Sequence, residues 1–333
     1  MKYLLCLLIA LASLSGCVER APKPRLGISF GVGTAQRWTY EMQVMTDRAR
    51  ALGLEVDARM NRNEEAKRQL ADCEEMINGG IDALIVVARD VTSMKHIVRK
   101  AQARGVKVIA YARASHDARY DFYVGYDTYR IGWSMGDTLV ERVARGNIAI
   151  LQGDARDINV PSLQDGAMRA IQPAVDSGDL RVILNESIER WSAERAKARL
   201  KQAVARNGGR LDGVLAHNDV LAGAAAEAVR EMGLKNHVSI VGMDAELSAL
   251  RRLARGEQDA TVYMDLKSMA AAAVEVADDL IKGRPAFANA EFQMPSGGSI
   301  TAYLVNGKIV TKENLDRLIV GPGVHSHQDV YGN

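Results

Sequence analysis

Several predicted strands of this chain are followed directly by side chains that could bind a polyhydroxyl ligand. Indole rings pack on the apolar C–H face of a sugar ring, and planar guanidinium, carboxylate and amide groups satisfy its hydroxyls. Hydrogen bonds to charged groups are roughly twice as strong as neutral ones. The candidate ligand-binding residues are Arg37, Trp38, Arg113, Asp157, Asn159, Trp191, Asn218 and Asp244.

Each of these side chains also has a purely structural interpretation. The carboxylates and amides could cap helices that begin near Pro161, Asn218 and Glu246. The two indoles could simply cover apolar surface. Because groups suited to a sugar follow so many different strands, a shared binding site is favoured over a series of unrelated roles.

The remaining polar residues give no sign of catalysis. Gly31-Val-Gly33 begins like a dinucleotide-binding loop, but no third glycine follows at the required spacing. His325 and His327 could bind a metal, yet their Gly-rich surroundings favour a solvated tail. His217 stands beside the candidate site, and we interpret it as a packing or supporting residue. We therefore expect no enzyme activity, no cofactor and no metal site.

The segments that would position the candidate residues alternate between strand and helix. Ala83–Val87 is continuously apolar, as expected for a parallel strand buried on both faces. Helical stretches separate the apolar runs, and this alternation predicts right-handed βαβ units and parallel sheets. The predicted strands are Leu26–Phe30, Ala83–Val87, Val106–Tyr111 and Phe122–Tyr126, followed by Ile148–Leu151, Val182–Leu184, Gly213–Ala216 and Val238–Val241.

Two such series predict an α/β fold with two similar lobes. Ligands of open α/β sheets bind beyond the carboxyl ends of the strands, so facing lobes would enclose one cleft. We expect the chain to cross between the lobes at Asp127–Ile131 and again at Thr261–Met264. The expected first lobe comprises residues 25–128 and 265–298, the second lobe residues 129–264 and 299–320, and a tail residues 321–333.

The N-terminal segment predicts export and lipid attachment. Lys2 and an apolar run precede Leu14-Ser15-Gly16-Cys17, which has the pattern of a bacterial lipoprotein signal. We expect residues 1–16 to be removed, Cys17 to carry lipid, and residues 17–24, with two prolines, to form a stiff spacer. A transmembrane anchor is the alternative, but the run is shorter than the roughly 20 residues a spanning helix needs. The protein is thus expected in the periplasm or at the cell surface, tethered to a membrane.

The net charge and the cysteine content exclude some binding partners and an internal disulfide. The chain has 333 residues and a formal net charge of +2, which argues against a nucleic-acid partner because such proteins usually present a clustered basic face. Cys6 is expected to leave with the signal and Cys17 to carry lipid, so Cys73 is left alone and cannot form an internal disulfide. Cys73 lies on an apolar helical stripe and is expected to be a buried, inert thiol rather than a reactive one.

Eight short segments keep a characteristic order and spacing from about residue 25 to residue 315. They are Gln36–Trp38, Asn63–Glu65, Met76–Asp82, Val106–Arg113, Asp157–Asn159, Asn218–Asp219, Gly242–Ala245 and Thr261–Tyr263. Together they resemble the motifs of periplasmic sugar-binding proteins of the ribose/galactose/xylose type, and most closely those of the xylose-binding branch.

The resemblance implies two Rossmann-like lobes joined by a three-segment hinge, the type I periplasmic binding protein fold. It also implies one monosaccharide in the cleft, sandwiched by Trp38 and Trp191, and a monomer that serves an ABC transporter permease. The alternative is a sensor whose closed form meets a membrane receptor or kinase. A transcription regulator with the same core would need a helix-turn-helix before Leu26, where the signal segment stands.

Four departures from the family pattern affect the expected ligand. Ala112 stands where the family carries aspartate, Gln164 where it carries arginine, and Met264 where it carries lysine or glutamine. Gly31-Val32 replaces an acidic or amide pair. Each change removes a hydrogen-bonding group, and an unmatched buried polar group costs about 1–3 kcal/mol. We therefore expect a ligand other than xylose itself, with a deoxy position or a bulkier substituent.

Overall fold

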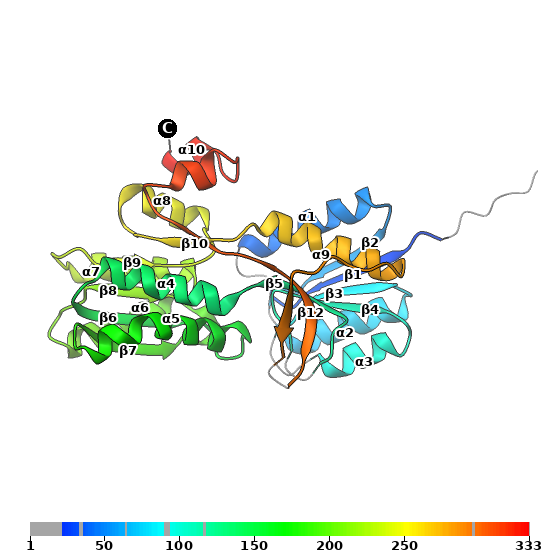
Figure 1. The fold of residues 1–333 in the computed structure, drawn as a ribbon, viewed down its shortest axis with the longest axis horizontal. Coiled ribbons are helices and arrows are strands. Elements are labelled where there is room, and N and C mark those ends of the chain that lie inside the picture. Colours follow the sequence, from blue (N-terminus) through cyan, green and yellow to red (C-terminus); the bar gives the residue numbers. More distant parts are fainter. Residues whose placement is uncertain are drawn as a thin grey trace, which may run out of the picture.

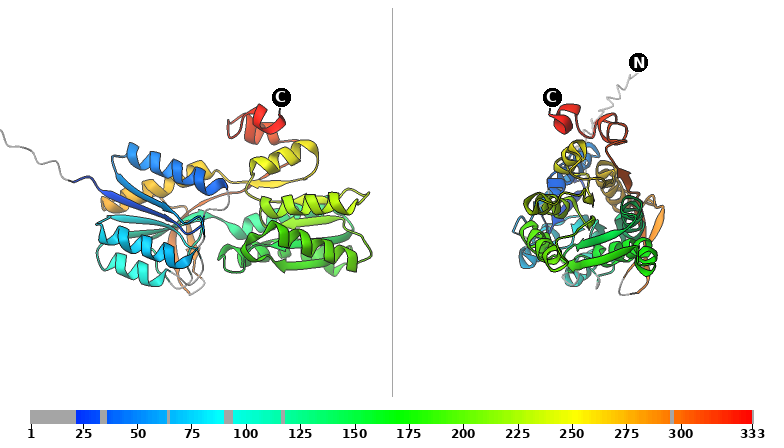
Figure 2. Two further views of the ribbon diagram at one scale, coloured as in Figure 1. Left: turned by 180° about the vertical axis from the view of Figure 1, so that it is seen from behind. Right: turned by 90° about the vertical axis from the view of Figure 1, so that its left-hand side faces the viewer.

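The computed structural model describes residues 22–32, 36–63, 65–89, 94–115, 118–294 and 297–332. The predicted signal segment, Cys17 and Gly33 lie outside these residues. Within them, two α/β lobes stand side by side, each with a sheet covered by helices on both faces (Figures 1 and 2). No helix of the described residues is both long and apolar enough to cross a membrane.

The first lobe is built on a seven-stranded sheet in the order β11-β12-β5-β4-β3-β1-β2. All neighbouring strands are parallel except the antiparallel pair β11 and β12. β1 lies between β2 and β3, and Leu26 aligns with Val56 on one side and Ala83 on the other. The strands are β1 (Arg25–Phe30), β2 (Glu55–Met60), β3 (Ala83–Val87), β4 (Lys107–Tyr111), β5 (Phe122–Tyr126), β11 (Ala290–Gln293) and β12 (Ser299–Val305).

Helices cover both faces of this sheet. α1 (Gln36–Ala51) and α9 (Leu266–Ile281) pack together on one face, and α2 (Ala66–Asn78) and α3 (Lys95–Gln102) cover the other. α2 begins after Glu65, whose side chain makes no capping hydrogen bond. Cys73 of α2 is fully buried, as predicted.

The second lobe has a four-stranded parallel sheet in the order β7-β6-β8-β9, with α4 and α5 on one face and α6 and α7 on the other. The backbones of α4 and α5 approach so closely that a methyl group at Gly166 would overlap the Tyr129 carbonyl. The elements are α4 (Thr128–Arg142), β6 (Gly146–Gln152), α5 (Asn159–Asp176), β7 (Leu180–Ser187), α6 (Ala193–Arg206), β8 (Gly213–Ala216), α7 (Asp219–Met232) and β9 (Ser239–Val241).

The chain passes between the lobes at three places, after β5, before α9 and after β12 (Figure 1). The second lobe is extended by β10 (Thr261–Tyr263), which pairs antiparallel with β13 (Lys308–Val310). A bridge from Val241 to Ala260 joins this pair to β9. The three passages form the three-segment hinge of the type I periplasmic binding protein fold.

One expected boundary between the lobes is wrong. We expected residues 299–320 in the second lobe, but β12 aligns with β5 in the first sheet, so the third crossing lies at Asn306–Gly307. β11 and β12 form a hairpin that closes the edge of β5, and β13 follows this crossing in the second lobe.

The expected tail of residues 321–333 is also wrong, because much of it is folded. α10 (His327–Tyr331) packs against α8 (Leu247–Arg255), and Val330 is buried in a small apolar cluster there. Ser326 and Asp329 form a reciprocal capping box that starts α10. The glycine-rich composition hid this short helix, whose stability comes from packing rather than from length.

Candidate functional site

All eight expected residues line one pocket of about 200 Å³ between the lobes. The carboxyl ends of both sheets and the first turn of α1 deliver them there. Their roles in binding remain predictions. The pocket is lined by Val32, Arg37, Trp38, Arg113, Tyr126, Thr128, Asp157, Asn159, Val160, Leu163, Arg190, Trp191, His217, Asn218, Val220, Met243 and Asp244.

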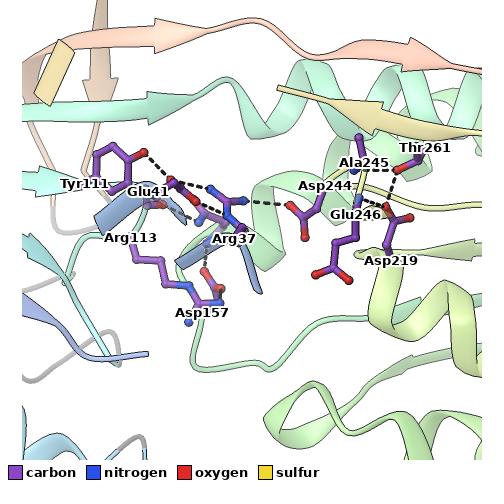
Figure 3. Close-up of polar contacts among 12 residues, drawn as sticks. Arg37, Glu41, Tyr111, Arg113, Asp157, Asp219, Asp244, Ala245, Glu246 and Thr261 are labelled. Carbon is purple, nitrogen blue, oxygen red and sulfur yellow. Dashed lines mark hydrogen bonds and ion pairs between the residues drawn. The ribbon is translucent and has the colours of Figure 1, made fainter. Parts of the chain in front are cut away.

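Arg37 is held in place by carboxylates from both lobes. Its Nε lies 2.7 Å from Glu41 Oε1, one turn along α1, and its NH1 lies 2.9 Å from Asp244 Oδ1 in the second lobe. Tyr111 also donates its hydroxyl hydrogen to Glu41 (Figure 3). Burial opposes the charged form of Arg37, but Glu41 and Asp244 outweigh it and raise its pKa. Arg37 is thus a permanent cation at the meeting point of the lobes.

Trp38 belongs to both the core and the pocket. Its ring meets Phe30 edge to face at 5.8 Å, and it is only 5% exposed. The guanidinium groups of Arg37 and Arg113 lie 4.5 Å and 5.5 Å from its ring centre, within cation–π range. Trp38 therefore covers apolar core surface, as the structural interpretation expected, and also lines the pocket.

A second set of contacts crosses the cleft near the end of β4. Arg113 NH2 lies 2.7 Å from Asp157 Oδ2 of the second lobe. The Ala112 carbonyl accepts hydrogen bonds from Asn159 Nδ2 at 2.7 Å and from the Tyr123 hydroxyl at 3.2 Å. The main chain at Ala112 thus supplies a polar contact at the position where the family aspartate is missing.

Trp191 is presented by a strained turn that follows β7. Arg190 and Trp191 have φ values of 57° and 55°, which non-glycine residues rarely adopt. Asp154 Oδ2 accepts a hydrogen bond from the Arg190 amide at 2.7 Å and so anchors the turn. The indole lies against Gly153, where any β-carbon would overlap the ring. Glycine at 153 is therefore a requirement for this placement of Trp191.

Asp244 is presented by a second strained turn, after β9. Asp244 and Ala245 have φ values of 104° and 50°. Buried Asp219 accepts hydrogen bonds from the Glu246 amide at 3.0 Å and the Thr261 hydroxyl at 2.8 Å through Oδ2. Thr261 Oγ1 in turn accepts from the Ala245 amide at 3.1 Å (Figure 3). Asp219 thus fixes the turn whose first residue reaches Arg37.

The helix-cap interpretations have mixed outcomes. Asn218 caps α7 through a 2.9 Å bond from the Leu221 amide while also lining the pocket. Asp244 does not cap α8, whose N-cap is Glu246. Asp157 accepts from the Asn159 amide at 3.0 Å, just before α5.

Several lining or supporting residues were missed by the sequence reasoning. Tyr126 ends β5, so the strand-end rule could have found it. Glu41 lies four residues after Arg37, the spacing of an ion pair within a helix. Buried Asp154 and Asp219 support the two strained turns, and no local sequence pattern indicates that role.

The other residues that depart from the family pattern lie in three different environments. Met264 lines a neighbouring pocket of about 420 Å³, beyond the Arg37–Asp244 pair, and not the cleft itself. A side chain at Gly31 would overlap Gln69, whose amide fills that space. Gln164 faces His217, with Oε1 and Nε2 3.1 Å apart. Among the described residues, no group of histidine, cysteine and acidic side chains could hold a metal ion.

Comparison with known proteins gives consistent matches. Residues 27–285 match the family model described as periplasmic binding protein domain. The D-xylose-binding periplasmic protein of Escherichia coli is 30% identical over 331 residues, covering 99% of both chains. The Haemophilus influenzae protein of the same name is 30% identical over 92% of both. A Clostridium phytofermentans solute-binding protein solved with β-D-glucose has a TM-score of 0.87 at 24% identity, covering 92% of this chain and 99% of its own.

Proposed function

Since the chain belongs to the periplasmic binding protein domain family, we propose that it captures a monosaccharide between its lobes and delivers it to an ABC transporter permease. Arg37, Trp38, Arg113, Asp157, Asn159, Trp191, Asn218 and Asp244 are the proposed ligand-binding residues. The similar D-xylose-binding proteins support a sugar as the ligand.

One observation carries this proposal. Residues far apart in the sequence converge on a single pocket whose lining combines three arginines with carboxylates, amides and indole rings. Such walls can donate to and accept from many hydroxyls while packing on an apolar ring face. The pocket offers binding groups rather than a nucleophile with its base.

Closure of the two lobes would convert binding into a signal for the membrane partner. Arg37 and Arg113 of the first lobe already reach Asp244 and Asp157 of the second. A ligand that contacts both walls favours the closed arrangement by its difference in affinity for the two states. A permease that recognises only the closed form would then receive loaded protein.

We propose further that Cys17 carries lipid and tethers the protein outside the cytoplasm. Tethering raises the effective concentration of the binding protein beside its membrane partner. The change Cys17→Ser would then move the protein from the membrane fraction to the soluble extract. Retention of the variant in the membrane fraction would contradict lipid attachment at this residue.

The ligand is proposed to be a xylose-like or modified sugar, and not xylose itself. Ala112 removes a side-chain partner beside Arg113, leaving only the main-chain carbonyl there. A ligand with a deoxy position or a larger apolar group suits that wall. A thermal-shift panel in which unmodified D-xylose gave the largest stabilisation would refute this choice.

Calorimetric titration tests the proposed function directly. The panel is D-xylose, D-ribose, L-arabinose, D-glucose, D-galactose, D-allose and myo-inositol, together with deoxy and alkyl-substituted derivatives of these sugars. Trp191→Ala should weaken binding of the tightest ligand by at least tenfold, because a stacked aromatic buries a large area. Trp133→Ala is the matched control, since Trp133 is 42% exposed and does not line the pocket. No binding by any member, or equal affinity in the two variants, would sink the proposal.

A further inference from the structure

Two polar atoms on side chains of the cleft wall are hidden from water and have no hydrogen-bond partner in the described part of the chain. They are Trp191 Nε1 and His217 Nδ1, and both residues line the pocket. Buried polar groups in proteins are nearly always paired, so each exception needs an explanation. We propose that His217 contacts the ligand and selects it, its Nδ1 accepting a hydrogen bond from a ligand hydroxyl.

The tautomer of His217 follows from a chain of amides behind it. Gln152 Nε2 and Gln164 Nε2 lie 2.6 Å and 3.3 Å from Asn185 Oδ1 and donate to it. Gln164 therefore turns its carbonyl oxygen toward His217, where Oε1 lies 3.1 Å from Nε2. A carbonyl oxygen can only accept, so Nε2 carries the proton. In a neutral imidazole the other nitrogen, Nδ1, is then an acceptor.

Burial keeps this imidazole neutral and in place. His217 is 1% exposed, and burial lowers its pKa to about 3. Its backbone amide donates to the Leu151 carbonyl at 3.0 Å, which fixes the residue at the end of β8. The next residue is Asn218, whose side chain is fixed by its cap on α7. Because its Nε2 is paired with Gln164 and its backbone with Leu151, the ring presents Nδ1 as a fixed acceptor.

The chemistry of this acceptor restricts the ligand. Nδ1 needs a proton from the ligand, which a free hydroxyl supplies and an ether, a carbonyl or a carboxylate does not. Trp191 Nε1 is a donor and needs an acceptor, which a hydroxyl oxygen also supplies. The ligand is therefore a sugar or polyol with an unsubstituted hydroxyl facing β8, and derivatives with a carboxylate or an O-methyl group at that position are rejected. This inference rests on the proposed function.

Calorimetry with altered sugars and altered protein tests it. The probes are the tightest sugar of the panel above and its monodeoxy and mono-O-methyl derivatives, titrated into the full-length protein. At the sugar position that faces His217, both the deoxy and the O-methyl change should weaken binding about tenfold. This is the expected effect of losing one hydrogen bond to a buried partner. His217→Phe should weaken the parent sugar by a similar factor, and removing that hydroxyl should then cost nothing more.

Two further variants make the result specific. Asn Oδ1 can take the place of the imidazole Nδ1, so His217→Asn should retain most of the affinity. His237→Phe is the control, because His237 is exposed in the same lobe and pairs with Asp259 on the surface. A folded His217→Phe variant with wild-type affinity would overturn the inference and leave the proposed function standing. Failure of every sugar to bind the wild type would overturn both.

Nitrogen NMR provides a measurement that needs no folded Phe variant. In ¹⁵N-labelled wild-type protein, the Nδ1 resonance of His217 should be that of an unprotonated ring nitrogen and should shift when the sugar binds. The His217→Asn spectrum assigns the resonance. A protonated Nδ1, or a resonance unmoved at saturation, would overturn the inference.

Discussion

Asp219→Ala should damage both stability and binding, because Asp219 anchors the turn that carries Asp244. The substitution leaves the Glu246 amide and the Thr261 hydroxyl without their buried acceptor. Each unsatisfied buried group costs about 1–3 kcal/mol, which gives about 2–6 kcal/mol in total. The positive φ values of Asp244 and Ala245 add strain that persists only while the surroundings hold it. The freed turn should relax, and Asp244 should leave Arg37.

Thermal unfolding and calorimetry measure the two effects. For lobes of this size 1 kcal/mol corresponds to about 2–4 °C in Tm, so Asp219→Ala should unfold at least about 4 °C below the wild type. Sugar affinity should fall by about tenfold or more, because Arg37 loses its partner across the cleft. The variant should remain folded at room temperature, since the damage lies in one turn.

Glu227→Ala is the matched control for this prediction. Glu227 lies on the same helix, α7, but is exposed and pairs with Lys197 and Arg230 on the surface. Such surface pairs contribute about 0.2–1 kcal/mol, so its Tm and affinity should stay close to wild type. If Asp219→Ala behaves like Glu227→Ala in both assays, the anchoring role of Asp219 is wrong.

Three further predictions follow from contacts near the site and in the core. Gly153→Ala should displace the Trp191 ring, weaken sugar binding about tenfold or more and shift the tryptophan fluorescence; unchanged affinity would contradict the placement of the ring. Cys73 should react with a thiol reagent only after denaturant is added, since burial raises its pKa to about 12; rapid labelling of the native protein would show that it is accessible. Burial raises the pKa of Asp154, but Arg156 and the Arg190 amide outweigh it and lower that pKa to about 2. The stabilisation from Asp154 is therefore complete above its unfolded pKa near 3.8 and is lost as the pH falls toward 2, so the Tm difference between wild type and Asp154→Asn should shrink between pH 5 and pH 2, and a constant difference would argue against this role.

Much of the fold was readable because buried parallel strands leave a strong local signal. The continuous apolar runs at Ala83–Val87 and Phe122–Tyr126 became β3 and β5. The carboxyl ends of such strands meet at one edge, which is why residues named from strand ends alone lie around one pocket.

The features that the sequence did not reveal depend on contacts between distant segments of the chain. Nothing in Ser299–Val305 itself indicates that it aligns with β5 and not with a strand of the second lobe, because an edge strand fits either sheet locally. The strained turns at Trp191 and Asp244 were hidden for a related reason. Their left-handed residues are not glycines, and distant carboxylates hold them in place.

The position of β12 also sets the order in which the two main sheets can be completed. The second sheet has all of its four strands by Val241, whereas the first sheet lacks β11 and β12 until Val305 has been made. As the chain emerges, the sheet that begins first is therefore completed after the four-stranded sheet, with the edge of β5 unpaired in the meantime. Unpaired edges of incomplete sheets are where nascent chains associate wrongly. In this protein the hairpin of β11 and β12 removes that risk when it pairs with the open edge of β5.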